Sequence, residues 1–187
     1  MNKIIFKNQL AALILCCLSV TANCFADGIT IEHASGRIKD SFYQIDANIS
    51  YELSESVQDA LLHGIALRFD TIIEIMRERN WVWDKNLGAT ILSFQLEYLP
   101  LSNNYLVTNI ITGKRTQHPM LEEALSALGT IKNFPVYSES GLNPERNYNC
   151  RIMSELRIRN LPLPLQPLAL LSPSWKLSSN WYEWTIR

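Results

Sequence analysis

The chain has 187 residues, of which 47% are apolar and 19% charged, and its formal net charge is -1. A disordered chain would be poorer in apolar residues and more strongly charged, so the composition excludes disorder. A basic nucleic-acid-binding protein is excluded as well, because phosphate binding requires a surplus of lysine and arginine. The length fits one domain, since two domains would each have a small core.

The first 26 residues have the three-part layout of a secretory signal. Lys3 and Lys7 precede an apolar run from Leu10 to Val20, and a polar stretch with small residues follows. The run is shorter than the roughly 18 apolar residues that a membrane span needs. We therefore predict a signal peptide over residues 1–26, cleaved between Ala26 and Asp27, and a periplasmic domain over residues 27–187.

Two alternatives would keep the chain at the membrane. The N-terminal segment could remain uncleaved as an anchor, or Cys24 could be lipidated, although Thr21 and Asn23 fit a lipobox poorly. Cleavage after residue 26 removes two lysines and three cysteines, which leaves a net charge of -3 and only Cys150. An exported domain with one cysteine has no internal disulfide, so its stability must come from its core.

Alternation of apolar and polar residues dominates the rest of the chain, as is typical of strands with one buried face. It predicts long strands over 43–52, 88–98 and 148–158, and shorter strands over 28–34, 105–112 and 181–187. The stretch 65–83 has the same character but is long for one strand. We expect a bend, a bulge or two strands there.

Two segments are expected to be helical. Ser54 is suited to cap a helix over 55–63, and Gly64 is suited to the left-handed position after its end. Pro119 is suited to the first position of a second helix, which Gly129 ends.

The segment 161–167 has three prolines among seven residues, which excludes a regular helix or a central strand. We predict an extended crossover packed by its leucines. The elements together predict a mainly β fold, an antiparallel β-sandwich (immunoglobulin-like or similar) with two short helices. The alternative is an α+β domain with its helices on one side of a single sheet.

The sequence contains no familiar catalytic or metal motif. The Gly-x-Ser-x-Gly, Cys-x-x-Cys and His-Glu-x-x-His patterns and Gly-rich phosphate loops are missing. The mature histidines, His33, His63 and His118, are far apart in sequence. Cys150 lies on the apolar parity of its strand, where a buried, inert thiol is expected. We predict no catalytic residue, no metal and no cofactor.

The segment 77–84 is the densest in chemical groups. In an extended chain Arg77, Arg79, Trp81 and Trp83 point the same way, so two guanidinium groups would lie beside two indoles. Such a face could bind an anionic or peptide partner, and we take it as the candidate partner-binding site. The alternative is that the indoles belong to the core and the arginines extend from its edge.

The polar face of the strand predicted over residues 148–158 carries arginines. We expect Arg151, Arg157 and Arg159 to form a solvated face, paired with acids on the neighbouring strand.

Several segments in order resemble one uncharacterised family of exported proteobacterial proteins, domain of unknown function 4390. The segments are ALLHGIALRFD, RERNWVWD, FQLEYLPLSNNYLV, LEEALSALG, LPLPLQPLAL and WKLSSNWYEW. The resemblance covers roughly residues 28–187 and implies a signal or N-terminal anchor, one compact domain and no assigned catalytic residues. It also implies a link to an envelope sensor kinase. Val82 stands where the family pattern has another tryptophan.

Three functional hypotheses follow. The first is a periplasmic, non-enzymatic interaction domain whose partner is an envelope protein or a membrane sensor. The second is a carrier of a small apolar ligand or lipid, held between the sheets. The third is an enzyme whose site is assembled in space, around His63 or His118.

Overall fold

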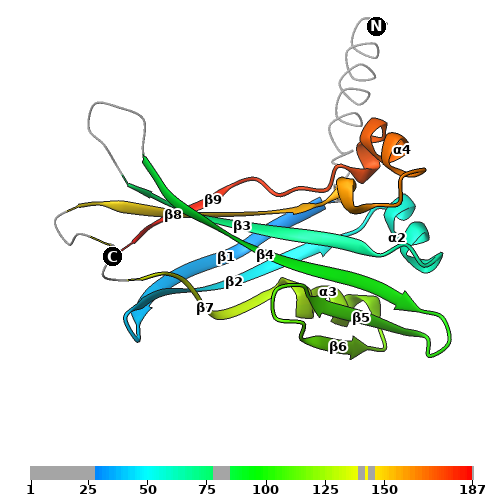
Figure 1. Ribbon diagram of the computed structural model, residues 1–187, viewed down its shortest axis with the longest axis horizontal. Coiled ribbons are helices and arrows are strands. Elements are labelled where there is room, and N and C mark those ends of the chain that lie inside the picture. The colour runs from blue at the N-terminus through cyan, green and yellow to red at the C-terminus, as the bar shows by residue number, and fades with distance from the viewer. Residues whose placement is uncertain (1–27, 78–84, 139–141, 143–145, 187) are drawn as a thin grey trace, which may run out of the picture.

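The computed structural model describes residues 28–77, 85–138, 142 and 146–186, which form two antiparallel sheets and three short helices (Figure 1). The smaller sheet has the strand order β1-β2-β7, and the larger has the order β6-β5-β4-β3-β8-β9. The protein is therefore mainly β and sandwich-like, as the alternation predicts, with two sheets rather than one.

The strands are β1 Gly28–Lys39, β2 Phe42–Glu52, β3 Leu67–Arg77, β4 Lys85–Leu99, β5 Asn104–Asn109, β6 Arg115–His118, β7 Thr130–Ser138, β8 Tyr148–Leu156 and β9 Tyr182–Ile186. The helices are α2 Glu55–Leu62, α3 Leu121–Gly129 and α4 Gln166–Leu171. Two 3-10 turns, η2 Ile158–Asn160 and η3 Pro173–Trp175, flank α4. Among the described residues, no helix is long and apolar enough to cross a membrane.

The core lies between the two sheets, where their alternating apolar residues meet. On β2 every second residue from Tyr43 to Tyr51 is buried, and β8 repeats this pattern from Tyr148 to Leu156. Two polar contacts join the sheets across this core. The indole N–H of Trp184 on β9 donates to the Tyr43 hydroxyl at 2.7 Å, and the hydroxyls of Tyr51 and Ser154 are 2.9 Å apart. Buried polar groups thus satisfy one another across the interface.

The first helix forms where the sequence predicts it, but its cap differs. Ser54 has the N-cap position, yet its hydroxyl donates to the carbonyl of Ser174 at 2.7 Å and makes no capping bond. The expected capping role was therefore wrong, and the side chain instead ties α2 to η3. Gly64 has a φ of 85°, which confirms the left-handed position expected after the helix.

The second helix begins two residues later than predicted. Met120 is the N-cap of α3, so Pro119 precedes the helix instead of opening it. Gly129 is its last residue, and β7 follows at once. Gly129 also packs directly on β2, since a Cβ there would lie 2.0 Å from the carbonyl oxygen of Ile49. Neither β7 nor β6 was predicted from the sequence.

The proline-rich segment is only partly extended. Gln166 and Pro167 already belong to α4, with the proline near the helix start, where its missing N–H costs no hydrogen bond. Leu161 is buried, but Leu163 is 79% exposed, so the leucines do not all pack inward as expected. The strand expected over 148–158 ends at Leu156 because η2 follows. In β3 the pairing with β4 shifts between Ile75 and Met76, which is the irregularity expected in the stretch 65–83.

Candidate functional site

A cleft opens between the larger sheet and the helix that links the two sheets. α3 contacts β2 and β7 on one side and β5 and β6 on the other, and it lies beside β5 in Figure 1. Between this helix, β7 and the inner face of β4, β5 and β6 lies a cavity of about 390 Å³. Ligand pockets start at about 300 Å³, so a small molecule fits.

The side chains that line this cleft form an apolar floor and a basic rim. Leu92, Val107 and Ile131 are buried at its floor, with the half-buried rings of Phe94 and Phe134 beside them. The rim carries the exposed Lys114 and Lys132, the half-buried His118, and the polar side chains Asn109, Thr116 and Thr130; Ala127 completes the lining. We call this cavity the basic cleft. None of these lining residues is acidic.

Local turn chemistry places Lys114 at the rim. The Asn109 side-chain oxygen accepts from the backbone N–H groups of Ile111 and Thr112 at 3.0 and 2.9 Å. Gly113 has a φ of 70°, which suits a residue without a Cβ. The turn closes with the Asn109 N–H donating to the carbonyl of Lys114 at 2.9 Å, so β6 returns beside β5.

A bulge in β7 positions the second rim lysine. Next to Lys132, Asn133 has a φ of 49°, and the pairing of β2 with β7 shifts its register there. Asp46 holds this bulge by accepting the Asn133 N–H at 2.7 Å, while Arg37 bridges Asp46 and the Asn133 side-chain oxygen at 2.7 and 2.6 Å. Bulges commonly re-aim side chains near binding sites.

A second cavity of about 440 Å³ lies between α3 and the first two strands. It is more polar, and its rim carries Glu32 and Glu122 with Asn48, Ser50 and Ser126. Both carboxylates are exposed to solvent. The basic cleft has the more apolar lining, which favours it as the ligand site.

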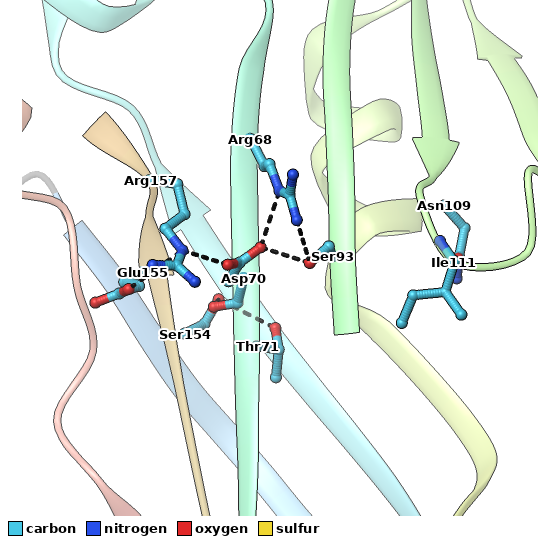
Figure 2. A network of polar contacts seen from close by, with 9 residues as sticks. All are labelled: Arg68, Asp70, Thr71, Ser93, Asn109, Ile111, Ser154, Glu155 and Arg157. Atoms are coloured by element: carbon cyan, nitrogen blue, oxygen red, sulfur yellow. Dashed lines mark hydrogen bonds and ion pairs between the residues drawn. The ribbon is translucent and has the colours of Figure 1, made fainter. Parts of the chain in front are cut away.

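The most buried charge of the described residues is elsewhere, on the outer face of the larger sheet. The Asp70 side chain on β3 is fully buried, and Figure 2 shows Arg68 and Arg157 converging on it. The guanidinium Nε of Arg157 donates to one carboxylate oxygen. The other accepts from the Ser93 hydroxyl at 2.6 Å and from Arg68 Nε at 3.3 Å.

These partners determine the ionisation of Asp70. Burial alone would raise the pKa of its carboxyl, but the hydrogen bonds from Ser93 and Arg157 and the charges of Arg157 and Arg68 outweigh burial and lower the pKa. The donors come from β3, from β4 and from the residue that follows β8, so the carboxylate ties β3 to β4 and to the end of β8. With both carboxylate oxygens occupied by donors, we interpret this cluster as structural.

The hydroxyl groups near Asp70 also have structural partners. Ser154 contacts Thr71 at 3.1 Å and Tyr51 at 2.9 Å, and its backbone N–H donates to the Ser179 hydroxyl at 3.0 Å. Cys150 is fully buried, as expected, and burial raises its thiol pKa to about 12.

The three histidines are placed apart. His63 follows α2 and lies 3.4 Å from Asp59, whereas His118 contacts the Thr116 hydroxyl at 3.0 Å on the rim of the basic cleft. His33 is exposed on β1. Within the described part of the chain, no three His, Cys, Asp or Glu residues gather as a metal site would require.

The predicted partner-binding face falls largely outside the described residues. Arg79, Trp81 and Trp83 belong to the stretch 78–84, for which the structure gives no description. Arg77 ends β3 in register with the buried Tyr148, so it lies on the core-facing parity of that strand. A shared face of these four residues stays a prediction.

Arg151 on β8 and Arg157 just after it pair with acids, as the sequence predicts. Arg151 donates to Glu74 on β3 at 2.7 Å, and its guanidinium carbon lies 4.3 Å from the centre of the Trp181 ring. Arg157 pairs with Asp70, and Arg159 is exposed. Sequence reasoning did not single out Lys114, Lys132 or Asp70. The sequence did contain a signal for Lys114, the Asn-x-x-x-Gly turn of residues 109–113 that precedes it.

The comparisons with known proteins give one result. No curated protein and no solved structure matches the chain. One family model, described as a domain of unknown function, matches residues 26–185, which is most of the chain. The chain therefore belongs to that family, DUF4390.

Proposed function

We propose that this protein is a non-enzymatic binding domain of the periplasm that holds an amphipathic anion, such as a medium-chain fatty acid, in the basic cleft. The observation that carries the proposal is the division of the cleft into an apolar floor and a rim with two lysines and a histidine. An alkyl chain would be buried against Leu92, Val107 and Ile131, and a carboxylate would face Lys114 and Lys132.

The two parts of such a ligand would contribute to binding in different ways. Apolar surface removed from water contributes about 25 cal/mol per Å², so the alkyl chain would supply most of the affinity. The lysines are exposed, so they contribute charge selectivity and a salt-dependent part of the affinity. The N-terminal layout supports export, since residues 1–26 have the parts of a secretory signal.

Calorimetric titration with dodecanoate tests the proposal. We expect Lys114→Gln combined with Lys132→Gln to weaken binding by about tenfold, which equals about 1.4 kcal/mol. Dodecanol and dodecylammonium should bind the unaltered protein more weakly than dodecanoate. Lys39→Gln removes an exposed lysine from β1, away from the cleft, and serves as the control with unchanged affinity. Equal affinity for the three ligands would contradict an anion site.

A further inference from the structure

One end of the molecule exposes four leucines. Leu62 ends α2 and is 49% exposed, and around α4 the exposed fractions are 79% for Leu163, 54% for Leu170 and 83% for Leu171. α4 packs with η2 and η3, and η3 packs with α2, so these leucines belong to neighbouring elements (Figure 1). Single exposed leucines are ordinary, but exposed leucines on elements that pack together are a candidate interaction surface. We call this group the leucine tip.

The charges around the leucine tip follow a simple pattern. Residues 161–175 contain no charged side chain, and the first charges on either side of them are Arg159 and Lys176. Both cations are exposed. The acids of the adjoining helix are Glu55 and Asp59, and Asp59 lies 3.4 Å from His63. An apolar segment flanked by cations is typical of surfaces that enter the interface of a bilayer.

The N-terminal segment joins the domain at this same end. Gly28, the first residue of β1, pairs with Glu52, which is the last residue of β2 and lies three residues before α2. The preceding residues include the apolar run 10–20 and the lysines Lys3 and Lys7. The segment predicted to be a secretory signal therefore joins the chain next to the leucine tip.

We propose that the leucine tip docks the domain on the surface of a membrane with anionic headgroups. Leu163, Leu170 and Leu171 enter the boundary between headgroups and acyl chains, while Arg159 and Lys176 contact lipid phosphates. This docking does not depend on a ligand in the basic cleft.

Vesicle co-sedimentation of the protein in the form that cells produce tests the docking. The probes are vesicles of phosphatidylethanolamine with phosphatidylglycerol, and vesicles of phosphatidylcholine alone. We expect preferential binding to the phosphatidylglycerol vesicles. The triple change Leu163→Ser, Leu170→Ser and Leu171→Ser should lower the partition coefficient at least tenfold. Arg159→Gln and Lys176→Gln should each lower it about fivefold.

A matched variant separates docking from general loss of apolar surface. Ile38→Ser with Ile111→Ser removes two side chains that are 44% and 62% exposed, far from α4 in the fold, and should leave vesicle binding unchanged. Leu171→Glu is a single change at a side chain that is 83% exposed, so the fold is retained while binding falls.

Four results would overturn the docking. The first is protein that stays off both kinds of vesicle, and the second is equal loss of binding in the triple and the control variants. The third is a change in the oligomeric state of the protein caused by the serine triple change, with no vesicle binding by the unaltered protein. A second copy of the chain would then cover the leucine tip. The fourth is vesicle binding that only chains retaining residues 1–26 show and that the triple change does not affect. Such binding would belong to residues 1–26 and would refute docking through the leucine tip.

Discussion

The carboxylate of Asp70 on β3 and the guanidinium of Arg157, the residue that follows β8, form a hydrogen-bonded ion pair on the outer face of the larger sheet. Asp70 is fully buried there because Arg68 and Arg157 extend over it (Figure 2). Together with the bond from Ser93, the pair shows how one buried carboxylate can tie β3 to β4 and to the end of β8.

Replacing Asp70 by Asn should destabilise the protein strongly. The change leaves two arginines without their shared counter-ion and weakens the bond from Ser93. Hydrogen bonds to a charged group contribute about 1.5–3 kcal/mol each, and Asp70 accepts such bonds at both carboxylate oxygens. Denaturation in urea at neutral pH measures the loss. Asp59→Asn, at an exposed pair with His63, is the control and should change the free energy of unfolding by less than about 1 kcal/mol.

The same carboxylate predicts an acid-dependent loss of stability. Its pKa is lower in the folded protein than in the unfolded chain, so its contribution is complete above the unfolded pKa of about 3.9. It is lost as the pH falls from there through the folded pKa. The stability difference between the unaltered protein and Asp70→Asn should therefore be constant from pH 7 to about pH 5 and shrink below about pH 4. A constant difference at lower pH would refute the role of its ionisation.

Gly129 should resist replacement even by alanine. The added Cβ would lie 2.0 Å from the Ile49 carbonyl oxygen, so α3 must move away from β2. We expect Gly129→Ala to lower the free energy of unfolding by about 1–3 kcal/mol, as overpacking does. Gly88→Ala on β4 meets no atom within 4 Å and should be close to neutral. Similar thermal denaturation midpoints for the two variants would show that α3 does not pack as closely as described.

Cys150 should be unreactive in the folded protein. Its thiol is fully buried, so a thiol reagent cannot reach the sulfur. Burial also raises the pKa of the thiol to about 12, so the reactive thiolate is nearly absent at pH 8. In denaturant, one thiol per chain should react if residues 1–26 have been removed, and four if they are retained unmodified. Rapid labelling of the native protein would contradict the burial of Cys150.

The long strands were predictable because they alternate without interruption. β7 was not, since Ile131 and Phe134 differ in parity across the bulge at Asn133, where φ is 49°. β6 has the sequence Arg-Thr-Gln-His and no apolar residue, so nothing in its composition marks it as a strand. Its pairing with β5 depends on the turn that Asn109 and Gly113 form.

The basic cleft could not be predicted from the sequence, for a related reason. Lys114 and Lys132 lie on either side of α3 in the chain, and only the return of β7 to the smaller sheet brings them to one rim. The pairing of Arg151 with Glu74 was predictable in kind, because opposite charges commonly face each other on adjacent strands. The particular partner followed only from the register of β3 with β8.

Methyl-group NMR during titration with dodecanoate tests the central claim most directly, because it locates the ligand. Binding in the basic cleft should change the chemical shifts of Leu92, Val107 and Ile131, which line it, and leave Leu61 and Ile152, which are buried outside its lining, nearly unchanged. No saturable change at the three cleft residues, or equal changes at all five, would rule out this binding site.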